Sequence, residues 1–178
     1  MNKNSIIKIS KFLSLILRHK PQTISLKLDA HGWADIDELI AKSKNIQLNR
    51  VIIDEVVAKN NKQRFIIKDN KIRANQGHSI GVDLEFKAVT PPDILYHGTA
   101  THFLESIMKT GLNRQKRQHV HLSQEITTAI AVGKRHGKVV LLEIDSKRMF
   151  DNGYEFYLSE NGVWLTDVVP VEYIKENK

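Results

Sequence analysis

The stretch RFIIKDNKIRA, residues 64–74, carries the clearest fold signal in the first half of the chain. Two short runs, 64–67 and 71–74, flank Asp69-Asn70, a pair typical of tight turns. The stretch therefore predicts a β-hairpin. Because three short helices are expected before it, the whole pattern predicts a winged helix, a relative of the helix-turn-helix that is often used on nucleic acids. Many small domains share this outline, so it indicates a fold more strongly than a function.

The three helices are predicted from apolar spacing and from capping residues. The first is expected to begin at Ser5 and to end near His19, because Pro21 disfavours helical geometry at the residue before it. Asp35, with Glu38 three residues later, predicts a capping box for a second helix over residues 36–42. Asn49 is expected to start the third helix. The sequence also predicts a strand at 25–28 and a turn at His31-Gly32.

After the hairpin the chain changes character. Glycines at 77 and 81 and the run Thr90-Pro91-Pro92 predict a linker over residues 75–93. We therefore expect an N-terminal lobe at 1–74 and a C-terminal lobe at 94–178. In the second lobe, strands are predicted at 95–98, 119–122, 138–144, 155–158, 163–166 and 171–174. Thr101 is expected to cap a helix that closes at Gly111, and Ser123 to cap a helix that runs to about His136. The fold class is α+β, with a mixed, mainly antiparallel sheet in the second lobe.

Charge is distributed unevenly along the 178 residues. The net charge is +7, and residues 1–90 hold 16 Lys and Arg against 9 Asp and Glu, whereas residues 91–178 hold 11 of each. A basic half indicates a polyanionic partner, although such a charge can also serve solubility alone. The absence of cysteine excludes disulfides and thiolate metal sites. With no signal peptide and no apolar run of about 20 residues, we expect a soluble cytoplasmic protein.

Four short polar blocks contain five of the eight histidines together with arginine, glycine or threonine. They are ILRHKP (16–21), IRANQGHS (72–79), LYHGT (95–99) and RQHVHLS (117–123). Guanidinium groups suit phosphate oxygens because their planar donors match them in pairs. His119 and His121 alternate on one strand face and could bind zinc, but no further ligands are evident. A ribose or phosphate is favoured, with ordinary packing of one of the two histidines as the alternative. Taken singly, each block is also compatible with an ordinary turn, linker or solvated helix end.

In this order, the four blocks resemble a known family. Together with HGW (31–33), AVGKRHGK (131–138) and NGVWLTD (161–167), they closely resemble the NAD-dependent, KptA-type RNA 2′-phosphotransferases. The resemblance extends from about residue 10 to residue 174. It implies an N-terminal winged-helix lobe that binds RNA and a C-terminal lobe of the ADP-ribosyltransferase fold that binds NAD.

The resemblance also implies a reaction. The family removes an internal 2′-phosphate from RNA, such as the one that some tRNA splicing pathways leave. The phosphate first attacks the nicotinamide ribose of NAD and expels nicotinamide, which gives an ADP-ribosylated RNA phosphate. The ribose 2″-hydroxyl then attacks the phosphorus, releasing 2′-OH RNA and ADP-ribose 1″,2″-cyclic phosphate. Alternatives are an ADP-ribosyltransferase that acts on nucleic-acid phosphate ends and a non-catalytic winged-helix nucleic-acid binder.

Residues are assigned by matching the family's motifs. The resemblance implies a catalytic set of Arg18, His19, Arg73 and Arg117. It places NAD at His97, Gly98, Thr99, Ser106, Ile107, Gly111, His119 and His121. Loop residues Asn75, Gln76 and His78 are expected to contact the RNA substrate. NAD is expected to be consumed as a co-substrate, with no metal, and the protein is expected to be a monomer.

Overall fold

The computed structural model describes residues 2–177, excluding the side chain of Lys3. The chain divides into two compact units, unit 1 (Met1–Glu85) and unit 2 (Phe86–Lys178). Each unit has its own hydrophobic core and its own antiparallel sheets. The division falls within residues 75–93, the stretch expected to be a linker.

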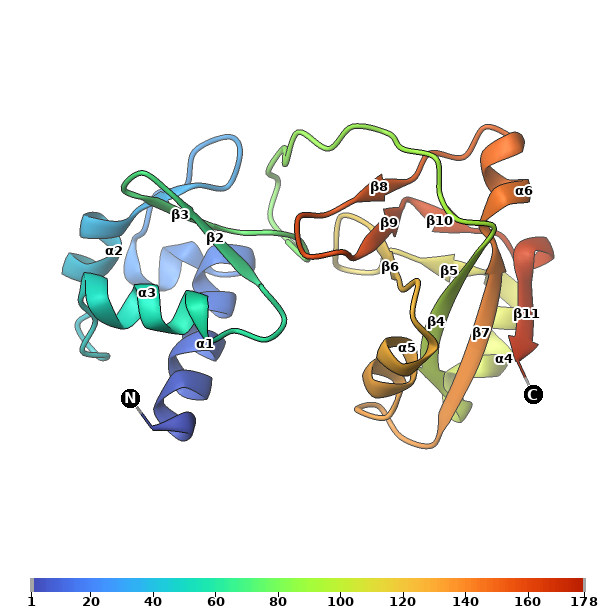
Figure 1. Ribbon diagram of the computed structural model, residues 1–178, viewed down its shortest axis with the longest axis horizontal. Coiled ribbons are helices and arrows are strands. Elements are labelled where there is room, and N and C mark those ends of the chain that lie inside the picture. Colours follow the sequence, from blue (N-terminus) through green and yellow to red (C-terminus); the bar gives the residue numbers. More distant parts are fainter. Residues whose placement is uncertain (1, 178) are drawn as a thin grey trace. The chain divides into compact units, whose positions relative to one another are not determined.

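Unit 1 combines three helices with a small sheet (Figure 1). The sheet has the order β1-β3-β2, and the predicted hairpin is present as β2–β3, with Phe65 opposite Ala74. Apolar side chains from the helices and from the hairpin form one core. The elements are α1 (Lys3–Arg18), a 3-10 turn η1 (Pro21–Ile24), β1 (Ala34–Asp35), α2 (Ile36–Lys42), α3 (Arg50–Ala58), β2 (Phe65–Lys68) and β3 (Lys71–Ala74).

Two predicted caps in unit 1 are confirmed and one is wrong. The side chain of Asp35 accepts a hydrogen bond from the Glu38 amide, and that of Asn49 accepts one from the Ile52 amide, both at 2.9 Å. Helix α1 instead begins at Lys3, because Asn2 accepts from the Ser5 amide at 2.8 Å. Asn2 therefore occupies the capping position, and Ser5 lies in the first turn of the helix.

The strand predicted at 25–28 is also wrong. Ser25 has a φ of 54°, a left-handed conformation that ends η1. The Leu26 amide donates to the Pro21 carbonyl at 3.0 Å, so this backbone closes a turn. The strand beside β3 is β1, in which Ala34 pairs with Ile72. Leu26 is nevertheless buried in the core of unit 1.

Unit 2 is built on antiparallel pairs of strands. The β4 and β7 strands run side by side over their full length (Figure 1), in a sheet of order β11-β7-β4. The other sheets are β6-β9-β8 and β10-β5. The elements are β4 (Ile94–Ala100), α4 (Thr101–Thr110), β5 (Leu112–Asn113), β6 (Val120–Leu122), α5 (Ile126–Gly133), β7 (Val139–Asp145), α6 (Ser146–Asp151), β8 (Tyr157–Leu158), β9 (Trp164–Thr166), β10 (Val168–Val169), a 3-10 turn η2 (Val171–Tyr173) and β11 (Ile174–Asn177).

Several boundaries in unit 2 differ from the prediction. Thr101 is the first helical residue of α4, and its side chain caps nothing because Ala100 holds the capping position. Ser123 exchanges two backbone hydrogen bonds of 2.8 Å with Tyr96, so α5 starts only at Ile126 and ends at Gly133. The last strand follows η2 and therefore begins three residues later than predicted. Helix α6 and strands β1, β5 and β10 were not predicted.

Close packing explains one glycine of the LYHGT block. A Cβ atom at Gly98 would lie 1.7 Å from the carbonyl oxygen of Ala129 on α5. Glycine therefore lets α5 approach the β4 backbone closely. No helix within residues 2–177 is long and apolar enough to cross a membrane.

Candidate active site

In unit 1, the end of α1 is joined to the loop that follows β3. The Ser79 amide donates to the Arg18 carbonyl at 2.9 Å, and the Ser79 hydroxyl lies 2.9 Å from Nδ1 of His19. His19 and Ser79 are 60 residues apart in the chain. These contacts place the blocks ILRHKP and IRANQGHS side by side.

Arg73 projects from β3 toward the turn that contains His31 and Trp33. Its guanidinium carbon lies 4.7 Å from the centre of the Trp33 ring, a cation–π contact, and Nη1 donates to the His31 carbonyl at 3.4 Å. No carboxylate of residues 2–177 forms an ion pair with Arg73. Its charge is therefore available to an anionic ligand.

His78 lies in the loop that follows β3 and is fully buried. Burial, together with the nearby charges of Arg18, His19 and Arg73, lowers the pKa of His78 to about 4. Its ring is therefore neutral at pH 7, and neither ring nitrogen has a hydrogen-bond partner among the described residues. Asn75 is also buried and anchors the loop, since its backbone N–H donates to the Arg64 carbonyl at 2.9 Å. Gln76 is half-buried.

In unit 2, two imidazoles are held in defined hydrogen-bonding states. Nδ1 of His97 on β4 lies 3.0 Å from the His121 carbonyl of β6. A carbonyl can only accept, so Nδ1 carries the proton. Burial lowers the pKa of His97, which favours the neutral ring with a lone pair on Nε2.

Arg117 lies beside the second of these histidines. Its Nη1 donates to Nδ1 of His121 at 2.5 Å, because arginine has no acceptor. The Arg117 side chain is exposed, and no ion pair with a carboxylate is found for it among residues 2–177. Arg117, His121 and His97 therefore form a polar group with one unneutralised positive charge.

An aromatic cluster lies next to β6. The rings of Phe86, His119 and Tyr157 have centres 5.6 to 6.3 Å apart, and His119 is 3.9 Å from the carboxylate of Asp167. Burial lowers the pKa of His119, although Asp167 opposes the shift. A hydrogen bond to Glu155 raises the pKa of Tyr157 to about 12. No group of three His, Asp or Glu side chains in the described part of the chain is arranged to hold a metal ion.

Comparison with known proteins identifies the family. Residues 4–168 match the family described as RNA 2′-phosphotransferase, Tpt1/KptA family. A protein of Acaryochloris marina named "Probable RNA 2′-phosphotransferase" is 58% identical over 94% of this chain and 95% of its own length. A protein of the same name from Fusobacterium nucleatum is 54% identical over 95% of this chain and 97% of its own length. Another from Flavobacterium johnsoniae is 51% identical over 98% of this chain and 98% of its own length.

The chain belongs to the RNA 2′-phosphotransferase family. It is therefore an enzyme, a transferase of the class that removes 2′-phosphate from RNA using NAD. This agrees with the resemblance drawn from the four blocks.

The site residues expected from the family resemblance lie in both units. Arg18, His19 and Arg73 gather in unit 1, and Arg117 lies with His97 and His121 in unit 2. Thr99 is buried in β4. On α4, Ser106 is exposed, whereas Ile107 packs against the core. Gly111 ends α4 with a φ of 75°, and a Cβ there would lie 2.3 Å from the Val169 carbonyl oxygen.

Sequence reasoning missed several parts of these groups. Trp33, which is half-buried beneath Arg73, was not assigned to the site. The contact between Ser79 and His19 joins distant segments, so no local pattern reveals it. The HGW motif was the available signal for Trp33, and the block IRANQGHS was the available signal for Ser79.

Proposed function

We propose that Arg18, His19 and Arg73 hold the 2′-phosphate of the RNA substrate, and that unit 1 acts as a winged-helix RNA-binding lobe. The observation that carries this proposal is the gathering of these three side chains around the loop at residues 75–79. A 2′-phosphate monoester carries about −1.5 to −2 charges at pH 7. Guanidiniums held in place can bind it and offset charge that develops on its oxygens.

The loop residues divide into two roles in this proposal. His78 and Asn75 are buried, so they support the loop from within and act on the substrate through it. Gln76 is half-buried and contacts the RNA directly. A neutral His78 adds no further positive charge beneath the cluster.

The groups of unit 2 suit NAD, and we assign this unit to an ADP-ribosyltransferase-type lobe. Arg117 supplies a guanidinium for a phosphate, His97 and His121 supply imidazoles for ribose hydroxyls, and Phe86, His119 and Tyr157 supply aromatic faces for a ring. When bound, NAD supplies an electrophilic ribose carbon with nicotinamide as the leaving group. In this proposal, Arg117 stabilises negative charge on phosphate oxygens during the reaction.

His19 has a defined place in proton transfer. Its Nδ1 lies 2.9 Å from the Ser79 hydroxyl, which orients the ring at the end of α1. The RNA 2′-oxygen needs a proton when its bond to phosphorus breaks. We assign this proton to the imidazole of His19, because imidazoles commonly act as general acids in catalysis.

The test is incubation with NAD and a defined oligonucleotide that carries one internal 2′-phosphate. We expect equal amounts of nicotinamide, 2′-OH RNA and ADP-ribose 1″,2″-cyclic phosphate, resolved by chromatography and mass spectrometry. An ADP-ribosyl adduct that persists on the RNA would instead indicate a transferase that stops after its first step. RNA binding without release of nicotinamide would indicate a non-catalytic binder.

Two arginine variants test the assignment of residues. Arg73→Ala and Arg117→Ala are each expected to lower kcat about 100- to 1,000-fold, since each removes a preorganised cationic donor. Arg135→Ala, which removes an exposed arginine outside both groups, is the matched control and should retain full activity. Circular dichroism should show that all three variants fold. Near-native rates in both active-site variants would refute the assignment.

A further inference from the structure

Helix α1 is unusual in its charge. The first 28 residues contain six Lys and Arg and neither Asp nor Glu, because the first acidic residue of the chain is Asp29. The remainder of unit 1, residues 29–85, holds nine Lys and Arg against nine Asp and Glu. The whole positive excess of unit 1 is therefore located in α1 and the segment that directly follows it.

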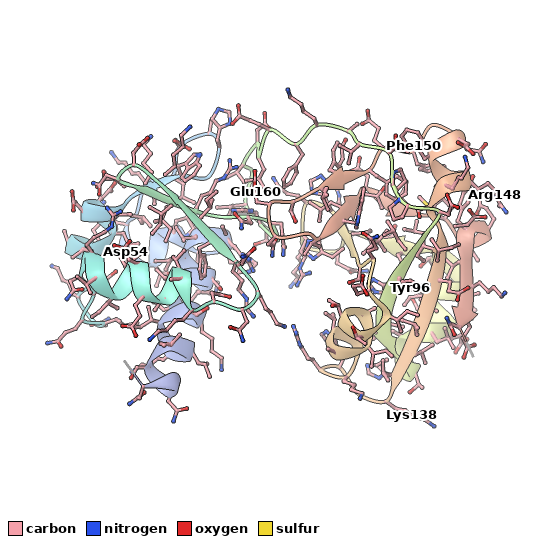
Figure 2. The ribbon with its side chains drawn as sticks, viewed as in Figure 1. Asp54, Tyr96, Lys138, Arg148, Phe150 and Glu160 are labelled. Atoms are coloured by element: carbon pink, nitrogen blue, oxygen red, sulfur yellow. The ribbon has the colours of Figure 1, made fainter. Side chains whose placement is uncertain are left out.

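Other charged helices contain ion pairs within the same helix. On the described residues, α2, α3, α4 and α6 each carry at least one ion pair between side chains four residues apart, with N–O distances of 2.5 to 2.9 Å. Asp54 on α3, labelled in Figure 2, is one of these partners. The pairs are Glu38–Lys42, Arg50–Asp54, Glu55–Lys59, Glu105–Lys109 and Lys147–Asp151. Helix α1 has cations and no acidic residue to pair with them.

The cations of α1 lie on one face and lead to the cluster. Lys8, Lys11 and Leu15 are exposed and, with Arg18, follow the three-four spacing of a single helix face. The opposite face is buried in the core of unit 1. At 1.5 Å per residue, Lys11 and Lys8 lie about 10 and 15 Å from Arg18 along the helix axis. Neither lysine forms an ion pair with a carboxylate among the described residues.

We propose that Lys8 and Lys11, here named the basic stripe, bind the backbone phosphates of the RNA on one side of the 2′-phosphate. This inference rests on the proposed function, which places the 2′-phosphate at Arg18. A polyanionic strand held at Arg18 finds two unneutralised cations along the same helix face, and each contact releases a condensed counterion. Exposed Leu15 lies between the stripe and Arg18 and offers apolar surface to a sugar or base. The basic stripe therefore favours substrates that extend beyond the modified nucleotide.

The test compares a long and a minimal substrate. The enzyme variant Lys8→Gln/Lys11→Gln is assayed on a 12-nucleotide RNA with a central 2′-phosphate and on a 2′-phosphorylated dinucleotide. We expect KM for the 12-mer to rise about 2- to 30-fold with kcat unchanged, as for two exposed ion contacts. KM for the dinucleotide should not change. The slope of log KM against log salt for the 12-mer should fall by about 1.4, or about 0.7 for each lost phosphate contact.

The matched control is Lys109→Gln/Lys147→Gln, which removes two exposed lysines from unit 2 and changes the net charge equally. It should leave KM for the 12-mer unchanged. An unchanged KM and salt slope in the stripe variant, or an equal change in the control, would overturn the proposal. If the wild-type enzyme turns over neither RNA, the proposed function fails. Fluorescence anisotropy of the 12-mer then still tests the basic stripe, because binding should weaken in the stripe variant alone.

Discussion

At the scale of single residues, buried His78 makes the free energy of unfolding depend on pH. Its pKa of about 4 lies below the ordinary value of 6.5, so in acid the unfolded chain takes up this proton before the folded chain does. The contribution of His78 is therefore fully present above pH 6.5 and is lost as the pH falls toward 4. We expect the free energy of unfolding to drop by up to about 3 kcal/mol across this window.

Chemical denaturation at pH 4.5 and pH 7.5 measures this effect. The variant His78→Asn should show a clearly smaller loss of stability between the two pH values than the wild type. Part of the loss of stability should remain in His78→Asn, because burial also lowers the pKa values of His97 and His119. The control His136→Asn changes an exposed histidine and should behave as the wild type does. Equal losses in wild type and His78→Asn would contradict the role given to His78.

At the scale of elements, the contact between β4 and α5 sets a steric limit at Gly98. In the variant Gly98→Ala the new Cβ would meet the Ala129 carbonyl oxygen at 1.7 Å, so the helix must move away from the sheet. We expect a loss of about 3 kcal/mol or more in the free energy of unfolding, measured by urea denaturation. Gly81→Ala is the control, since nothing lies within 4 Å of its Cβ position and its φ is not in the left-handed range. A stable, soluble Gly98→Ala protein would show that the packing is looser than described.

Elements were predictable where the deciding contacts are local. The caps at Asp35 and Asn49 and the hairpin at 64–74 depend on residues within a few positions, and all three were found. The caps assigned to Thr101 and Ser123 failed for a tertiary reason: β4 extends to Ala100, and Ser123 pairs with Tyr96. The two-residue strands β1, β5 and β10 exist only through their distant partners, so no sequence period marks them.

The residue types of the candidate site could be read from the sequence, but their arrangement could not. The assignment of Arg18, His19, Arg73 and Arg117 as the catalytic set stays a prediction. The contacts that organise them, such as Ser79 with His19, join segments remote in sequence. The packing role of Gly98 could not be read from the sequence either, since the helix that requires it lies about 30 residues further along the chain.

At the scale of the whole molecule, the two hydrophobic cores are separate. One contains buried residues from Ile9 to Ala74 and the other from Leu95 to Ile174. We expect calorimetry to resolve two unfolding transitions, because each unit has its own core. Leu13→Ala should lower the midpoint of one transition and Leu142→Ala that of the other, each at a cost of about 2 to 5 kcal/mol. One transition that both substitutions lower equally would show that the units unfold together.

The stacking of Arg73 on Trp33 gives the enzyme an internal optical reporter. An indole in contact with a guanidinium experiences the electric field of that cation, and a dianion arriving at Arg73 would change the field. The emission of Trp33 would then follow occupancy of the proposed phosphate site without any attached dye. Trp164, the other tryptophan, is buried in the core of unit 2 and would supply a constant background to that signal.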